Sequence, residues 1–426
     1  MQVEILGVLR GARGPGQDMI LAKLRGTKPE YTGVVAGMSG SPVYIGNKLL
    51  GALSYRIGQF ARDPIAGITP IAQMLEVKNL PVTTQWASTS LPRSQSATGT
   101  QTQNEAGSVP VGNMNFQAME TPLVMSGFHP EAIRLWQKQM AGTGLDLIAA
   151  GGGSGSSKSD AEGGFGAISP SAIASVVPGS AVSAQLVRGD LEVSATCTVT
   201  YVDPKQLLAC GHPILQAGTV SLPMTTAEVV ETLASPLNAF KIINTGDAIG
   251  TFTEDRDSAI RGVLGIKPHM IPVHITVHGE GADRKLNIEV VDLPSLTPQA
   301  VLVSLYDSLL QNNQSSAETS YHVTGSVNIE GYPPSPLDLW APAGDQGSAQ
   351  LSAALQADQS FAVLYANGAR QGAIKAVDLD VQSIPRRAQI QLENARINTG
   401  DIVHAGDSIV VEATVRPWQQ PARNIR

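Results

Sequence analysis

Two short segments of this 426-residue chain carry side chains that could do nucleophilic chemistry. The first is the turn at residues 37–42, Gly-Met-Ser-Gly-Ser-Pro, which follows a short apolar run. A serine on such a tight turn can expose its Oγ while nearby backbone N–H groups converge on one point. Acyl transfer needs that nucleophile and those donors, so Ser39 is a candidate. Clusters of Gly, Ser and Pro are also common in ordinary loops, so the turn alone is modest support for a catalytic serine.

The second segment is a Gly-His-Pro turn that presents His212 at the exit of a predicted hairpin over residues 198–209. A neutral imidazole, with its usual pKa of about 6.5, can take the serine proton and return it to a leaving amine. A lone histidine in such a turn is more often a surface or capping residue. Together with Ser39 it becomes the candidate general base, and the N–H groups of Gly37 and Ser39 become the candidate oxyanion hole.

Both segments resemble the active-site segments of one enzyme family. Residues 37–42, with the strand at 51–54 and residues 64–68, resemble the active-serine segment of the SpoIVB-type sporulation serine peptidases. Residues 202–213 resemble that family's histidine segment, a hairpin ending in Ala-x-Gly-His-Gly, with Pro213 in place of the last glycine. The two matches carry the resemblance together, because either alone would be unspecific.

The resemblance covers residues 1–78 and 180–275 and implies a chymotrypsin-like double β-barrel. It implies a serine peptidase that acts on a protein or peptide substrate without a metal or organic cofactor. In that fold the strand after the serine pairs with substrate, which here selects Leu53, Ser54 and Tyr55. An ordinary core strand is the equal alternative.

The acid of a Ser/His/Asp triad is left open by the resemblance. Chymotrypsin-like enzymes place it some forty residues after the histidine, which selects Asp255 first and Asp257 second. SpoIVB-type enzymes are assigned an aspartate shortly before the serine. This chain has only Glu30 there, with Asp18 further upstream. Asp255 could instead cap a turn against a neighbouring arginine.

Ser39 precedes His212, whereas both groups of relatives have the histidine first. A circular permutation is the simplest account, and triad chemistry depends on geometry rather than chain order. We therefore expect a mainly β protein with four parts: residues 1–78 as a serine-bearing barrel half, 79–165 as a flexible linker with a short helix, 166–275 as the histidine/aspartate-bearing half, and 276–426 as a C-terminal β-sandwich-like module.

Composition agrees with a β-rich chain. Aromatic residues make up 4% of the chain, and 43 glycines and 27 prolines favour many short strands and turns. The net charge of −7 and the lack of a basic cluster argue against nucleic acid as a partner. No apolar run reaches the roughly 18 residues of a membrane span.

Relatives of this type are exported, whereas residues 1–7 already have the pattern of a strand. We therefore expect an exported protein whose leader lies upstream of this sequence. The predicted hairpin turn near 204–205 pairs position 210 with 199, which predicts that Cys197 and Cys210 are two buried free thiols.

Several further elements are expected from local patterns. The exposed polar stretch 79–165 suggests self-cleavage, and its Gly/Ser run at 151–158 is typical of a tether. Arg188-Gly-Asp is expected to be a hairpin turn, and His274 and His278 a solvated strand face. Helices are predicted over 71–77, 130–140, 225–233 (from a Thr225/Glu228 capping box) and from Thr297. The rival functional class is a catalytically silent β scaffold that binds extended peptides or envelope proteins along residues 53–55.

Overall fold

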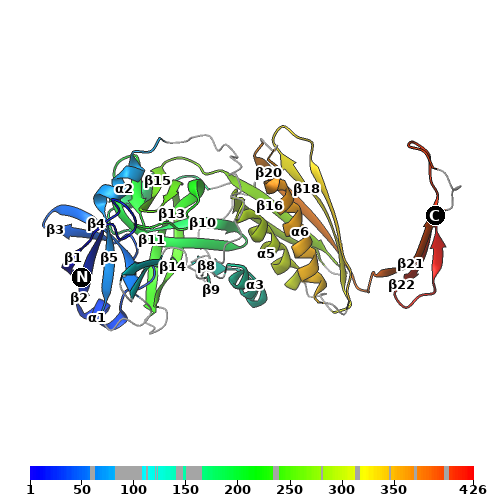
Figure 1. The fold of residues 1–426 in the computed structure, drawn as a ribbon, viewed down its shortest axis with the longest axis horizontal. Helices are drawn as coiled ribbons and strands as arrows, with labels where there is room; N and C mark the ends of the chain where they lie inside the picture. The colour runs from blue at the N-terminus through cyan, green and yellow to red at the C-terminus, as the bar shows by residue number, and fades with distance from the viewer. Residues whose placement is uncertain are drawn as a thin grey trace.

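The computed structural model is elongated, with two β-sheets packed together at one end, a helix-covered extension of the second sheet in the middle and a small third sheet at the other end (Figure 1). It describes residues 1–57, 63–81, 108–111, 114–119, 121, 123–140, 147–149, 166–233, 239–279, 282–311, 317–344, 347–368, 372–397 and 403–426. Within the linker expected at 79–165, the Gly/Ser run at 151–158 lies outside these ranges.

The first sheet carries Ser39 and has seven strands in the order β1-β2-β5-β4-β7-β6, with β3 paired to β4. Alternate side chains of β2, at Ile20, Ala22 and Leu24, are buried and form part of its core, as the period of a strand requires. Its elements are β1 (Gln2–Leu9), β2 (Met19–Arg25), α1 (Thr27–Thr32), β3 (Pro42–Ile45), β4 (Lys48–Ile57), β5 (Ile65–Pro70), α2 (Ile71–Lys78), β6 (Ser108–Val111) and β7 (Met114–Ala118).

The second sheet carries His212 and has thirteen strands in the order β19-β18-β20-β16-β17-β10-β13-β14-β15-β12-β11-β8-β9, with β10 also pairing with β11. Because β10 also pairs with β11, the part of the sheet from β10 to β11 closes into a ring of six strands. The elements of this part are β8 (Leu123–Ser126), α3 (Pro130–Met140), β9 (Leu147–Ala149), α4 (Pro170–Ser175), β10 (Ala181–Gly189), β11 (Glu192–Val202), β12 (Gln206–Ala209), β13 (Gly218–Leu233), β14 (Phe240–Arg256) and β15 (Ala259–Leu264).

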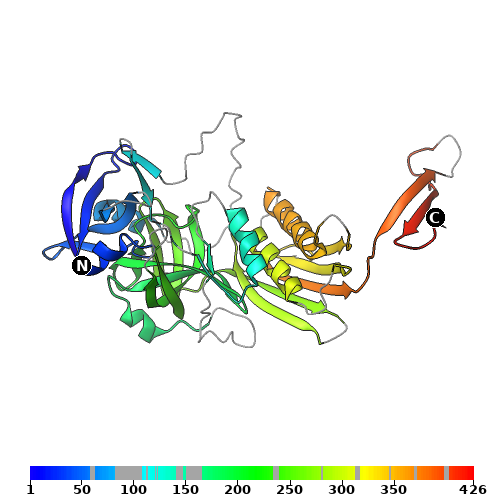
Figure 2. The same cartoon turned by 90° about the horizontal axis from the view of Figure 1, so that it is seen from below.

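The remaining strands of that sheet form a two-layer unit with helices, not the expected β-sandwich. Helices α5 and α6 pack on each other and on one face of the sheet, and α3 lies beside α5 (Figure 2). The elements are β16 (Met270–His278), β17 (Arg284–Val291), α5 (Thr297–Leu310), β18 (Ser320–Ile329), β19 (Ser335–Ala341), α6 (Ala349–Ala366) and β20 (Ile374–Ile384). Beyond them β21 (Ile390–Ile397), β22 (Val411–Pro417) and β23 (Arg423–Ile425) form a separate sheet.

Predicted helices at 71–77, 130–140 and from Thr297 are confirmed as α2, α3 and α5. The predicted helix at 225–233 is wrong, because this stretch is the second half of β13. Thr225 pairs with Ala248 of β14, and Glu228 pairs with Asn244. Long-range pairing with a 17-residue strand outweighs the local capping-box signal.

The expectation of two free cysteines is also wrong, because Cys197 and Cys210 form a disulfide. The register of β11 against β12 shifts between Val199 and Tyr201, so Val199 pairs with Ala209 and not with residue 210. Cys210 then leaves the ladder with φ of +67°, and its Cα comes within 5.2 Å of that of Cys197. A bulge of this kind is not visible in the sequence.

The two sheets dock along a seam that contains both hydrogen bonds to backbone carbonyls and apolar side-chain contacts. The Thr198 N–H donates to the Ser39 carbonyl over 2.8 Å, and Thr200 Oγ1 donates to the Gly40 carbonyl over 2.7 Å. An apolar cluster beside these bonds joins both sheets and contains Ala52, Met74, Val77, Leu208 and Ala259. The seam therefore places the serine turn directly against β11.

Gly40 makes this close approach possible. Its φ is +89°, and a Cβ at this position would lie 1.9 Å from the Thr198 carbonyl oxygen. That atom is backbone in the centre of β11 and cannot move aside cheaply.

Among the helices that the structure describes, none is long and apolar enough to cross a membrane.

We predict that Gly40→Ala lowers the free energy of unfolding by at least about 2 kcal/mol, because the new methyl group collides with β11. Gly46→Ala is the matched control. Gly46 also has a positive φ, of +57°, but has open space around it, so only the backbone cost of about 1 kcal/mol applies. Equal losses in urea titrations of the two variants would show that the seam does not depend on Gly40.

Candidate active site

Ser39 lies on the turn that leads from α1 into β3. Gly37 and Gly40 both have φ of +89°, and the Gly40 N–H donates to the Leu53 carbonyl of β4 over 2.8 Å. The Ser39 side chain is 0% exposed, and its Oγ has no hydrogen-bond partner among the described residues. A buried hydroxyl without a partner is costly, which is typical of groups held for a function.

The expected oxyanion donors are also unoccupied. The backbone N–H groups of Gly37 and Ser39 make no hydrogen bond within the described part of the chain, while those of Met38, Gly40 and Ser41 are all paired. Two free N–H donors on either side of one residue can bind a developing oxyanion.

His212 lies on a turn after β12 that packs against the serine half. Cys210 and Gly211 both have positive φ, and Thr69 Oγ1 of β5 donates to the Gly211 carbonyl over 2.7 Å. A Cβ at Gly211 would lie 2.1 Å from Ser54 Oγ. The His212 turn therefore contacts the same strand, β4, that holds the Ser39 turn.

The tautomer of His212 follows from its one hydrogen bond. Nδ1 lies 2.7 Å from the Pro213 carbonyl oxygen, which can only accept, so Nδ1 carries the proton. Nε2 then has a free lone pair, and it is buried without a hydrogen-bond partner. Ser39 Oγ and His212 Nε2 make no hydrogen bond with each other in this structure.

Burial also keeps the His212 imidazole neutral. Desolvation lowers the pKa of His212 to about 4, with a smaller lowering from the positive charge of Arg13, against the raising effect of the Pro213 carbonyl. At neutral pH the ring is therefore an unprotonated base.

Asp255 makes no hydrogen bond with His212 in this structure, contrary to the expectation for a triad acid. Its carboxylate accepts from the backbone N–H groups of Ile214, Leu215 and Ala217, at 2.8, 2.7 and 3.4 Å. Burial raises the pKa of Asp255, and these N–H groups oppose the rise. Asp255 thus holds the loop that follows His212. The hydrogen bond from His212 Nδ1, which a triad carboxylate would accept, goes to the Pro213 carbonyl instead.

The other candidate acids also hold backbone turns or side chains away from His212. Asp257 accepts from the Gln216 side chain over 2.7 Å, Asp18 from the Gly11 N–H over 2.8 Å, and Glu30 from the Gly26 N–H over 3.3 Å. None of the four carboxylates hydrogen-bonds His212 within the residues described.

The substrate strand expected at residues 53–55 is not a free edge. Met119 donates its N–H to the Ser54 carbonyl over 2.8 Å, and Tyr55 pairs with Ala118 of β7. Residues 53–55 are all buried. The edge beside the serine turn is therefore occupied by a later part of the same chain.

Two basic residues near the site had no sequence signal. Arg13, on the Gly-rich β1–β2 turn, donates to Tyr55 Oη and the Asp257 carbonyl. Lys241 Nζ donates to the Gly37 carbonyl over 2.9 Å, and burial lowers the pKa of this lysine. Their partners lie far away in sequence, so only the docked fold brings them to the seam.

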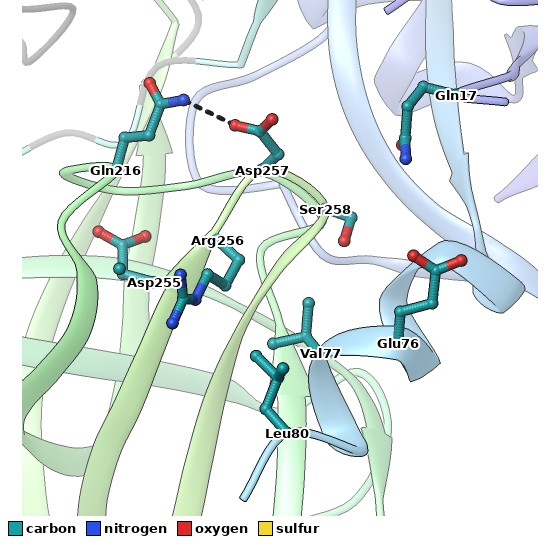
Figure 3. Close-up of a pocket in the computed structure, with 10 residues that line it drawn as sticks. Gln17, Glu76, Val77, Leu80, Gln216, Asp255, Arg256, Asp257 and Ser258 are labelled. Atoms are coloured by element: carbon teal, nitrogen blue, oxygen red, sulfur yellow. Dashed lines mark hydrogen bonds between the residues drawn. The ribbon is translucent and has the colours of Figure 1, made fainter. Parts of the chain in front are cut away.

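A pocket of about 510 Å³ has Asp255 among the residues that line it (Figure 3). Glu76 and Val77 of α2 face the hairpin residues 255–258 across it, and the Gln216–Asp257 hydrogen bond lies at its edge. Ser39 and His212 do not line it. The described residues contain no group of three or more His, Cys, Asp or Glu placed to hold a metal ion.

Comparisons with models of known protein families, with curated proteins and with solved structures found no match. The likeness to SpoIVB-type peptidases therefore rests on the two sequence segments alone.

The depressed pKa of His212 predicts a pH dependence of stability. In the unfolded chain the imidazole takes a proton near pH 6.5, whereas in the fold it does so only near pH 4. The unfolded state thus binds more protons between these values, and the free energy of unfolding falls as pH falls from 6.5 to 4. Relative to His212→Gln, the wild type should lose about 3 kcal/mol over this range in urea titrations. Parallel curves for the two proteins would contradict the burial of a neutral ring.

Asp255→Asn separates a loop anchor from a triad acid. An amide presents N–H donors to backbone N–H groups, so we expect about 2 kcal/mol lower stability on thermal unfolding. Asp257→Asn, on the same hairpin, is the control and should cost less than about 0.5 kcal/mol. Unchanged stability of Asp255→Asn, together with lost reactivity of Ser39, would instead favour a triad role.

Proposed function

We propose that this protein is a serine endopeptidase in which Ser39 attacks a peptide carbonyl and His212 acts as the general base. The observation that carries the proposal is a pair of buried atoms without partners, Ser39 Oγ and His212 Nε2, on two turns that contact the same strand. The two residues come from different sheets and are far apart in the sequence, so only the docked fold could bring them together.

The geometry supports a division of roles. Nε2 of the neutral ring would accept the Oγ proton and return it to the leaving amine. The Gly37 and Ser39 N–H groups would bind the oxyanion of the tetrahedral intermediate. The Pro213 carbonyl would hold the ring tautomer, as a carboxylate does in a triad.

Apo sites often hold these atoms further apart than the reacting complex does. In this proposal the Ser39–His212 hydrogen bond forms when the two turns move together across the seam. The Cys197–Cys210 disulfide favours an oxidising compartment, which fits the expected export. Self-cleavage between residues 79 and 165 remains part of the proposal, and a falling intact mass on incubation would test it.

The rival function is a catalytically silent scaffold that binds extended peptides. It is favoured by one observation, the exposed fractions of Ser39 and His212, which are 0% and 2%. A nucleophile that no substrate reaches in any state would do no chemistry.

Labelling by a fluorophosphonate probe tests the proposal. Wild type should be labelled, and Ser39→Ala and His212→Ala should each lose at least 100-fold in labelling rate, the order expected when a nucleophile or base is removed. Ser41→Ala, on the same turn, is the control and should keep its label. A folded wild type that resists labelling at all concentrations would favour the scaffold.

A further inference from the structure

Strand β4 has one edge on which three different segments follow each other. Its other edge pairs with β5 between Gly51 and Arg56. On the first edge, β3 pairs with the start of β4 up to Ala52, and β7 pairs with its end from Tyr55 to Ile57. Between them Leu53 accepts from Gly40. The serine turn and β7 are therefore neighbours on a single strand edge.

A bulge brings them to adjacent carbonyls. The register of β4 against β5 shifts between Leu53 and Tyr55, so Ser54 is an extra residue. Successive carbonyls then reach the same edge: Leu53 accepts from Gly40 over 2.8 Å and Ser54 accepts from Met119 over 2.8 Å. The backbone of Met119 thus lies next to the turn that bears Ser39.

The Met119 side chain is buried beside that turn. It is 1% exposed and belongs to an apolar cluster with Val43, Leu53 and Ile68, against which Met38 packs. Met38 directly precedes Ser39. The surrounding groups are apolar, and methionine is unbranched and flexible, so a long apolar side chain fits among them.

After Met119 the chain crosses the seam. Thr121 is 3% exposed with an unpartnered Oγ1, and Leu123 already pairs with Ala195 of β11. β11 also donates to the Ser39 carbonyl through Thr198. The chain therefore leads from the edge of β4, beside the Ser39 turn, to β11, the strand that donates to the Ser39 carbonyl.

We propose that residues 116–119 are a built-in substrate analogue, which occupies the peptide-binding edge of β4 and fills a side-chain pocket specific for unbranched apolar residues with Met119. This inference rests on the proposed peptidase function. Extended peptides bind proteins by adding a strand to such an edge, with backbone bonds giving affinity and pockets giving specificity. The cis segment competes with any substrate at a high effective concentration, so the enzyme is latent until β7 leaves.

The test uses the full chain and a labelled, end-blocked peptide, Met-Asn-Phe-Gln-Ala-Met, which has the sequence of residues 114–119. Met119→Ala weakens the cis segment by removing most of its buried side chain. We expect this variant to bind the peptide at least tenfold more tightly than wild type does, and to react at least threefold faster with the fluorophosphonate. A peptide with norleucine in the last position should bind equally well, and one with aspartate should not bind.

Met140→Ala is the matched control, because Met140 is an equally buried methionine in α3, away from the serine half. It should bind the peptide as weakly as wild type. Equal peptide affinity of wild type and Met119→Ala would overturn the inference, as would a preference for the aspartate peptide.

Hydrogen exchange on the unmodified protein keeps the test decisive if Met119→Ala unfolds. Excess peptide should speed deuterium uptake in residues 116–119 at least threefold and leave β16 to β20 unchanged. Unchanged uptake in 116–119 would contradict the inference. If the peptide displaces residues 116–119 but no variant is labelled by the fluorophosphonate, the inference about the β4 edge is supported and the peptidase proposal is rejected. If the protein is labelled but the peptide does not displace residues 116–119, the peptidase proposal is supported and the inference about the β4 edge is rejected.

Discussion

Two close approaches join the two halves of this protein, one at Gly40 and one at Gly211. A side chain at either position would collide with the facing strand, with the Thr198 carbonyl in one case and Ser54 Oγ in the other. Each glycine lies beside a residue proposed to do chemistry. The same two contacts therefore dock the sheets and set the positions of Ser39 and His212, and stability and reactivity share one constraint.

The seam between the two sheets buries polar side chains that include Ser39, His212 and Asp255. Burial removes the charge from His212, a carbonyl fixes its proton on Nδ1, and neither Ser39 Oγ nor His212 Nε2 has a hydrogen-bond partner among the described residues. Asp255 acts one step away, through the loop that it holds by three backbone N–H groups. The edge of β4 beside the serine turn, on which we propose that a substrate binds, is already paired with residues of the same chain.

The sequence predicted the parts of this arrangement whose signals are local. The glycines of the Ser39 turn, the α3 periodicity and the Pro298 start of the α5 helix each depend on a few neighbouring residues. The mainly β character followed from composition, whereas the chymotrypsin-like permutation stays a prediction. Pairing across long distances overrode local signals elsewhere: β13 is a strand despite its capping box, and a bulge at Thr200 brings the two cysteines together. Arg13, Lys241 and Met119 reach the seam through the tertiary fold, which no local pattern encodes.

The central claim is that Ser39, His212 and the Gly37 and Ser39 N–H groups form one reaction centre across the seam. A crystal structure of the protein after reaction with a peptidyl phosphonate tests this most directly. We expect phosphorus bonded to Ser39 Oγ, the phosphonyl oxygen within hydrogen-bond distance of both N–H groups, and His212 Nε2 facing the adduct. An unmodified Ser39 with the phosphonate on another residue, or an adduct with His212 turned away, would contradict it.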